Sequence, residues 1–196
     1  MARDRASRPE AKAQRLFVAV EIPQEVREAL AEAVAPLREQ LPGARWVPVA
    51  NQHLTLQFLG ATWPRLVPWV GEQVAGVAAR HAPFEVAIDG SGTFPNDRRP
   101  RILWAAVVDP HGRLGAIARD LDSSLARELK AEEREFTPHL TLARLDGKTP
   151  TTEALAAATV PSLRFDVGHL TLLRSHLRRP TPVYEPLLEV DLTGSA

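Results

Sequence analysis

The sequence predicts an α+β protein made of two copies of one strand-helix-strand-helix-strand unit. Short stretches with strand-like alternation are followed by longer stretches whose apolar residues recur with the period of a helix. The phrase His-Leu-Thr-Leu appears at His53–Leu56 and again at His139–Leu142, 86 positions later. Arg15 and Arg101 each precede the histidine of one phrase by 38 positions. Since a whole unit recurs, and not only a phrase, we interpret the pattern as an internal duplication.

The two units are expected to span about 15–95 and 101–192, within a single bilobal domain that covers 15–196. Residues 1–14 are polar and show no apolar period, so we expect a disordered tail there. The chain of 196 residues is long enough to bury a sizeable core.

The first unit contains two helix patterns between three strand patterns. Pro42-Gly43 ends the first helix, and the second is expected to start near Pro64, since proline fits the first turn of a helix. In order, the predicted elements are a strand at Leu16–Ile22, a helix with the apolar face Val26, Leu30, Val34, Leu37 and Leu41, a strand from His53 to near Gly60, a helix presenting Val67, Val70, Val74 and Ala78, a strand at Phe84–Ile88 and a turn at Asp89–Gly92.

The second unit repeats this series and adds a final strand. In order, the predicted elements are a strand at Ile102–Val108, a turn at Asp109–Gly112, a helix with Leu114, Ile117, Leu121, Leu125 and Leu129 on one side, a polar run at Lys130–Glu135, a strand at the second phrase, a short helix after Pro150, a strand at Leu163–Leu173 and a last strand near Leu187–Leu192.

The composition is that of an ordinary soluble globular protein, with 44% hydrophobic and 24% charged residues. A formal net charge of zero excludes a global basic field for long duplex nucleic acid, so any RNA contact is expected to be local. The lack of cysteine excludes disulfides, thiolate metal sites and cysteine nucleophiles. We find no pattern for a membrane span or a secretion signal, and therefore expect a cytoplasmic protein. The sequence implies no protein partner, and we expect a monomer.

Each His-Leu-Thr-Leu phrase has two chemically different faces. Residues two apart share one face of a strand, so His53 and Thr55 project together, as do His139 and Thr141, while the leucines project the opposite way. Two such strands across a cleft would bring two imidazoles and two hydroxyls around a small anion. The pattern indicates a site for phosphate chemistry.

A third copy of the phrase begins at His169. It has no strand-helix unit of its own before it, and the stretch around it matches the first unit at a shift of 81, which puts His169 where that unit has Ile88. We therefore predict a structural position for His169 and assign the active pair to His53 and His139.

Several longer segments carry a family resemblance that runs from Arg15 to about Leu188. They are Leu16–Val20, Trp46–Pro48 before His53–Gly60, Arg99–Ala105, Phe136–Arg144, and Leu172–Ser175 with Tyr184 downstream. In these segments the chain resembles the 2H phosphoesterases, and within them the RNA 2′,3′-cyclic phosphodiesterases formerly called 2′-5′ RNA ligases. The resemblance implies two pseudo-symmetric lobes, with antiparallel or mixed sheets lining a central cleft, helices outside, and neither a metal nor another cofactor.

The resemblance also implies roles for individual residues. His53 would act as proton donor to the 3′ oxygen and His139 as proton acceptor from water, although the sequence alone supports the pair without saying which histidine does which. The hydroxyls of Thr55 and Thr141 can donate to the non-bridging phosphate oxygens. Arg144 is the family position for a further phosphate contact.

Two of the proposed substrate contacts have an ordinary structural alternative. A regular strand would point Arg144 away from the face of His139, so this contact requires a bulge or a strand end, and otherwise Arg144 is a solvated surface residue. Trp46 could stack on a base near the cleft or belong to the core.

The expected activity is hydrolysis of RNA 2′,3′-cyclic phosphate ends to 2′-phosphomonoesters without a metal. Within the family, the substrate could instead be another cyclic or 2′-5′-linked nucleotide, with 2′-5′ RNA ligation as a side activity. Two rivals come from other classes: a metal hydrolase that uses the same histidines as ligands, and a non-catalytic module that binds RNA ends.

Overall fold

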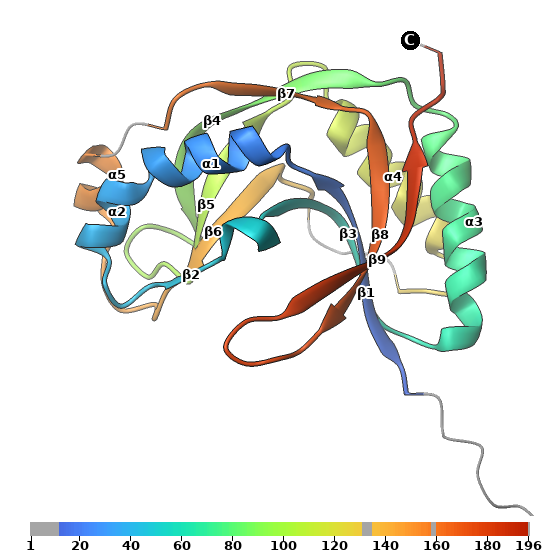
Figure 1. The fold of residues 1–196 in the computed structure, drawn as a ribbon, viewed down its shortest axis with the longest axis horizontal. Helices are drawn as coiled ribbons and strands as arrows, with labels where there is room; N and C mark the ends of the chain where they lie inside the picture. The colour runs from blue at the N-terminus through green and yellow to red at the C-terminus, as the bar shows by residue number, and fades with distance from the viewer. Residues whose placement is uncertain (1–11, 131–134, 158–159, 196) are drawn as a thin grey trace, which may run out of the picture.

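The computed structural model describes residues 12–130, 135–157 and 160–195 (Figure 1). Along the chain the elements are β1 (Gln14–Glu21), α1 (Gln24–Ala33), α2 (Ala35–Gln40), β2 (Arg45–Trp46), the 3₁₀ turn η1 (Val49–Asn51), β3 (His53–Thr62), the 3₁₀ turn η2 (Pro64–Leu66), α3 (Val67–Ala78), β4 (Phe84–Phe94), β5 (Ile102–Val108), α4 (Arg113–Leu125), β6 (His139–Arg144), α5 (Thr152–Ala157), β7 (Leu163–Val167), β8 (His169–His176) and β9 (Val183–Asp191).

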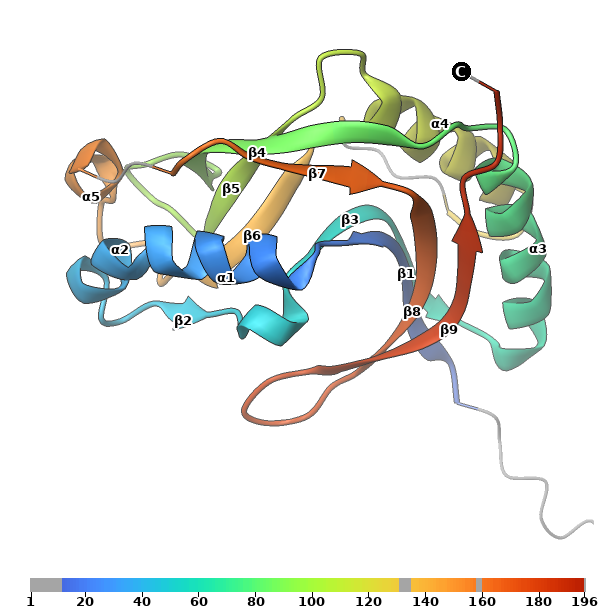
Figure 2. The same cartoon turned by 45° about the horizontal axis from the view of Figure 1, so that its top comes forward.

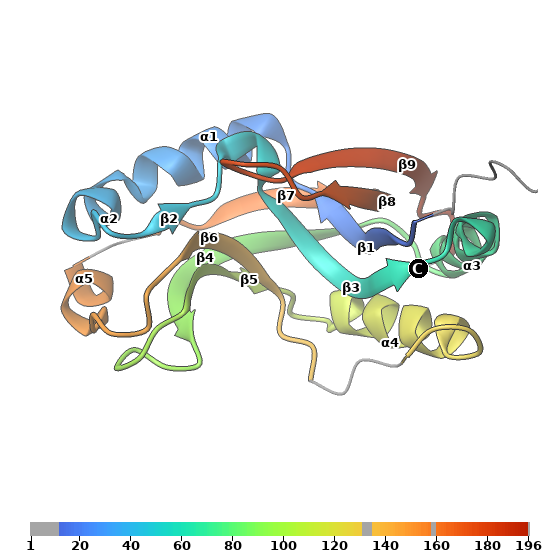
Figure 3. The same ribbon diagram turned by 90° about the horizontal axis from the view of Figure 1, so that it is seen from below.

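The strands form one curved, antiparallel sheet in the order β7-β4-β5-β6-β3-β1-β8-β9, with the short β2 paired to β6. This order is symmetric about its centre, where β6 meets β3 (Figure 3). Outward from the centre, β5 corresponds to β1 and β4 to β8. We call β3, β1, β8 and β9 the β3 lobe, and β6, β5, β4 and β7 the β6 lobe. The predicted α+β class with two pseudo-symmetric lobes is confirmed.

The lobes do not coincide with consecutive halves of the chain. β4, the last strand of the first predicted unit, pairs with β5 and β7 in the β6 lobe. β8, from the second unit, pairs with β1 and β9 in the β3 lobe. The β6 lobe is therefore one continuous stretch of chain, and the β3 lobe is assembled from both ends of the fold.

Helices cover the outer side of the sheet (Figures 1 and 2). α1 contacts β7, while α3 and α4 pack against each other and contact β8, β9 and β3. The predicted apolar face of the first helix is buried at all five positions, but a break at Val34 divides it into α1 and α2. Pro36, in the first turn of α2, explains the break, because it has no amide hydrogen to continue the α1 ladder.

Two predicted elements were wrong in a way that matters for the topology. The turn expected at Asp89–Gly92 is part of β4, where Ile88 pairs with Val107 and Ser91 pairs with Ala105. The extra residue is a bulge, and Gly90 supplies it with a φ of 85°. The single strand expected at Leu163–Leu173 is two strands, because at Gly168 the chain leaves β7 in the β6 lobe and enters β8 in the β3 lobe.

The predicted tail at 1–14 lies mostly outside the described residues, and β1 already begins at Gln14. Most of the polar run predicted at Lys130–Glu135 also lies outside them. In the part of the chain that the structure describes, no helix is long and apolar enough to cross a membrane.

Candidate active site

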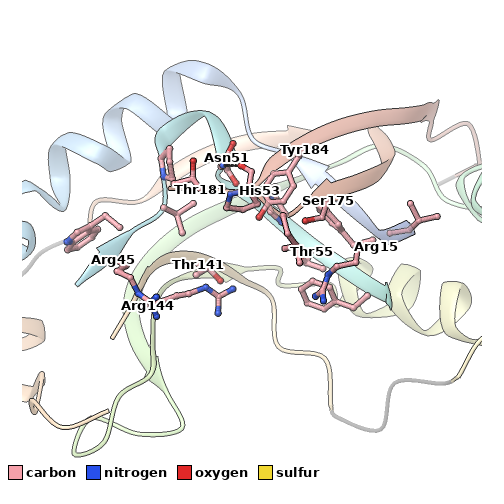
Figure 4. A pocket seen from close by; sticks show the side chains of 18 of the residues that line it. Arg15, Arg45, Asn51, His53, Thr55, Thr141, Arg144, Ser175, Thr181 and Tyr184 are labelled. Carbon is pink, nitrogen blue, oxygen red and sulfur yellow. Dashed lines mark hydrogen bonds between the residues drawn. The ribbon is translucent and has the colours of Figure 1, made fainter. Parts of the chain in front are cut away.

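A pocket of about 420 Å³ opens where the two lobes meet (Figure 4). All six residues that the sequence singled out line it: His53, Thr55, His139, Thr141, Arg144 and Trp46. His169 begins β8 and is not among the lining residues that the structure describes. The structure thus brings the two phrases of the predicted pair to one place and leaves the third phrase outside it.

The central strand pair explains why the two phrases meet. Leu54 of β3 pairs with Leu140 of β6, and both leucines are fully buried. Because Leu54 and Leu140 are paired, His53 and Thr55 flank the contact on β3, and His139 and Thr141 flank it on β6. The contact between the strands therefore brings both imidazoles and both hydroxyls to one pocket.

Both imidazoles are held in the same way. Nδ1 of His53 lies 2.8 Å from the carbonyl oxygen of Asn51, and Nδ1 of His139 lies 2.7 Å from that of Thr137. A carbonyl oxygen can only accept, so each Nδ1 carries the proton and donates it. Nε2 is then the nitrogen left to exchange a proton, and in neither ring does it have a hydrogen-bond partner among the described residues.

Aromatic rings surround His53 and His139 differently. The ring centroid of His53 lies 4.8 Å from that of Phe17 and 5.1 Å from that of Tyr184 in an edge-on contact. His139 makes edge-on contacts with Phe94 at 5.2 Å and with Trp104 at 6.4 Å. Each imidazole is thus in contact with a pair of aromatic rings, but the two pairs differ in composition.

Burial lowers the pKa of His53 from its ordinary value of 6.5, because the imidazolium loses its water. The carbonyl of Asn51 opposes this change by accepting a hydrogen bond from the charged ring, and a positive charge on His139 would lower the pKa of His53 further. Burial and a positive charge on the neighbouring His139 thus both favour the neutral form of His53.

Arg144 reaches the pocket through a bulge of the kind that the sequence required. In β6, Thr141 pairs with Trp104 and Ala143 with Leu103, so Leu142 is an extra residue. Because of this extra residue, the side chain of Arg144, at the end of the strand, lies on the same face as Thr141 and His139.

Phe58 is a pocket residue that the sequence reasoning missed. β3 contains the same bulge as β6, since Thr55 pairs with Ala19 and Gln57 with Val18. Phe58 is therefore turned into the pocket, and 58% of it is exposed. Phe58 and Arg144 each follow their histidine by five positions, so the duplication itself was the signal that could have found Phe58.

Trp46 lines the pocket and is half-buried. The guanidinium carbon of Arg38 lies 5.0 Å from the centre of its ring, so part of the indole is already covered. Phe58 is by contrast the more exposed aromatic surface for a base.

The described residues include no group of three or more His, Asp or Glu side chains arranged to hold a metal ion. The polar groups that converge on the pocket are imidazoles, hydroxyls and guanidiniums, and the guanidiniums come from Arg15, Arg45 and Arg144. Such donors suit a phosphate-containing ligand.

The symmetric sheet and the paired His-x-Thr strands define a two-lobed protein of the 2H phosphoesterase class. The chain belongs to the 2′-5′ RNA ligase superfamily, whose family model matches residues 23–179. The family resemblance read from the sequence is confirmed.

Two relatives are similar to this chain over most of its length. The RNA 2′,3′-cyclic phosphodiesterase of Geobacillus stearothermophilus is 34% identical over 91% of this chain, which spans 57% of that protein. The RNA 2′,3′-cyclic phosphodiesterase of Thermus thermophilus is 35% identical, and the alignment covers 92% of this chain and 91% of the relative.

Among solved structures, the crystal structure of E. coli LigT complexed with 3′-AMP superposes with a TM-score of 0.74 and 29% identity. The match covers 92% of this chain and 99% of LigT. The similarity therefore extends over both lobes and the pocket between them.

Proposed function

We propose that this chain hydrolyses RNA 2′,3′-cyclic phosphate ends to 2′-phosphomonoesters by general acid-base catalysis between His53 and His139, without a metal. One observation carries the proposal: two imidazoles with the same tautomer and unpartnered Nε2 atoms share a pocket with two hydroxyls and a guanidinium. Relatives named RNA 2′,3′-cyclic phosphodiesterase support the reaction, and a LigT structure holding 3′-AMP supports a nucleotide as the ligand.

In the proposed reaction the two histidines act on opposite sides of phosphorus. Nε2 of His139 takes a proton from water, and the water oxygen forms a bond to phosphorus. The bond between phosphorus and the 3′ oxygen breaks on the far side, and His53 gives that oxygen the proton from its Nε2. The products are a 2′-phosphomonoester and a free 3′ hydroxyl. The origin of the two rings on different strands, β3 and β6, supports this in-line geometry.

The hydroxyls and the guanidinium would hold the charge that grows on the non-bridging oxygens. Thr55 and Thr141 line the same pocket as the two imidazoles, and each can donate one hydrogen bond. Arg144 adds a guanidinium, a planar cation with several hydrogen-bond donors. Phe58, together with the free part of Trp46, offers an aromatic surface for the terminal base.

The lowered pKa of His53 bears on its role as proton donor. Burial favours the neutral ring. A cyclic phosphate carries one negative charge, and placing it beside the ring favours the imidazolium. The substrate would thus bring the charge that keeps the donor protonated.

A product-identified assay tests the proposal. An RNA oligonucleotide with a 2′,3′-cyclic phosphate end is expected to yield the 2′-monoester, with a rate that chelator does not change. His53→Ala and His139→Ala are each expected to lower the rate by about 10²–10⁴-fold. His169→Ala, the control, is expected to keep it.

Each competing hypothesis gives a different result in the same assay. A 3′-monoester product would reverse the direction of cleavage, and loss of activity in chelator would indicate a metal hydrolase. Normal RNA binding without turnover would indicate a non-catalytic module that binds RNA ends. A 2′-5′-joined product would indicate RNA ligation. The monomeric state and the cytoplasmic location stay predictions.

A further inference from the structure

The pocket has a second basic end that the proposed reaction does not use. Figure 4 shows Arg45 and Arg144 at one end, and Arg15 with Ser175 at the other, with His53 and Thr55 between them. Arg15 is exposed, and none of the described residues makes an ion pair or a hydrogen bond with its guanidinium. An unpaired cation inside a pocket is a recognition element for an anion.

Strand register fixes the direction of Arg15. It lies two positions before Phe17 on β1, so the two side chains share one face, and Phe17 packs against the ring of His53. Arg15 faces Ser175 across β1 and β8, and Ser175 faces Tyr184 across β8 and β9. The guanidinium and the serine hydroxyl therefore belong to the same concave face as the histidine, one step farther along it.

Phe58 lies between the two groups of charge. It pairs with Phe17 on β1, and the ring centroids of these two residues are 6.2 Å apart. Consider the terminal nucleotide of an RNA strand, with its base on Phe58 and its cyclic phosphate between the histidines. It has one further anionic group, the phosphodiester on its 5′ oxygen. The residues nearest to that remaining end of the pocket are Arg15 and Ser175.

Resting on the proposed function, we propose that Arg15 and Ser175 bind the phosphodiester on the 5′ side of the terminal nucleoside. The site thereby recognises an RNA chain end and disfavours an isolated cyclic nucleoside. A guanidinium and a hydroxyl can both donate to the non-bridging oxygens of one phosphate. Because the chain has no net charge, such a local cation is what would hold the strand.

The test compares two unreactive ligands that differ in a single group, adenosine 2′-phosphate and adenosine 2′,5′-bisphosphate. Calorimetric titration of the wild type is expected to give tighter binding of the bisphosphate by about tenfold to a hundredfold, the range of a charged hydrogen bond. Arg15→Gln is expected to remove this preference and to leave the affinity for the monophosphate unchanged. Ser175→Ala is expected to remove part of it, and added salt is expected to weaken it.

The control variant is Arg178→Gln, which removes the same charge from the exposed loop after β8 but from outside the pocket lining. It is expected to keep the preference. A wild type without preference, a preference that survives in Arg15→Gln, or one lost in Arg178→Gln would overturn the inference. If the proposed function is wrong, the product assay shows this separately, because the cyclic phosphate then stays closed.

Discussion

β3 and β6 carry the same four-residue phrase, yet they have diverged around it. In both strands the histidine donates from Nδ1 to the carbonyl two residues earlier, and in both a bulge follows the threonine. The bulge delivers an aromatic ring from β3, Phe58, and a cation from β6, Arg144. The duplicated frame thus supplies two matched histidines. The position after each bulge differs in chemistry and, under the proposed function, contacts a different part of the nucleotide.

The largest expected effect in this comparison comes from the position five residues after each histidine, which is Phe58 in β3 and Arg144 in β6. Arg144→Ala is expected to lower kcat by about 10²–10³-fold, as for loss of one donor to a developing oxyanion. Phe58→Ala is expected to act mainly on KM, by about tenfold to a hundredfold, since base stacking is worth about 1–3 kcal/mol. Steady-state kinetics on one cyclic-ended oligonucleotide separates the two effects. Phe58→Leu and Arg144→Lys are the matched controls, and an equal effect of both alanine variants on kcat would show that the positions are not specialised.

A second expectation concerns the pKa of His53. Burial lowers this pKa below 6.5. In the free protein, His53 is therefore expected to be neutral at neutral pH and to become protonated only below pH 6.5. Inorganic phosphate in the pocket should raise the pKa, since an anion favours the imidazolium. NMR titration of the imidazole carbon-bound protons measures both, with His139→Ala as a variant that removes the neighbouring charge and should raise the pKa slightly. A midpoint above 6.5 in the empty protein would contradict the burial argument.

The smallest expected effect comes from the residues that hold the two rings. Asn51 and Thr137 both accept from a histidine through their backbone, but Nδ2 of Asn51 also donates to the carbonyl oxygen of Pro182, at 2.8 Å. This bond links the segment before His53 to the loop between β8 and β9, which lines the pocket at Thr181 and Pro182.

Asn51→Ala is therefore expected to lower kcat/KM about twofold to tenfold, the worth of one ordinary hydrogen bond, and to speed amide hydrogen exchange in that loop. Thr137→Ala is the control at the equivalent position, and it should change neither quantity. Equal effects of the two variants would mean that the side chain of Asn51 has no coupling role.

Local sequence patterns were sufficient for the elements that depend on local contacts. The stripe from Val26 to Leu41 and the strand at Ile102–Val108 follow from periodicity, because the apolar face of each element decides how it packs. The faces of the two phrases could be predicted for the same reason: the leucines are buried, and the histidines and threonines line the pocket. Pairing His53 with His139 rather than His169 needed the spacing of the duplication as well.

The sequence did not reveal which strands pair with each other or where the bulges lie. Gly168 looks like an ordinary strand residue until β7 and β8 are seen to pair with strands of different lobes. A bulge changes which face a residue takes, and strict alternation hides it, which is why Phe58 went unnoticed and Arg144 stayed ambiguous. Arg15 is far from either phrase in the sequence, and only the pairing of β1 with β3 and β8 brings it to the pocket.

The composite origin of the β3 lobe has a consequence during synthesis on the ribosome. Both His-x-Thr strands emerge well before β8 and β9, yet β8 covers the open edge of β1, and Tyr184 of β9 packs against the ring of His53. A chain released early, at Gly168, would contain both histidines and still lack one wall of the pocket. The last strands to be made thus complete the pocket, and we expect a chain truncated before them to lack the proposed activity.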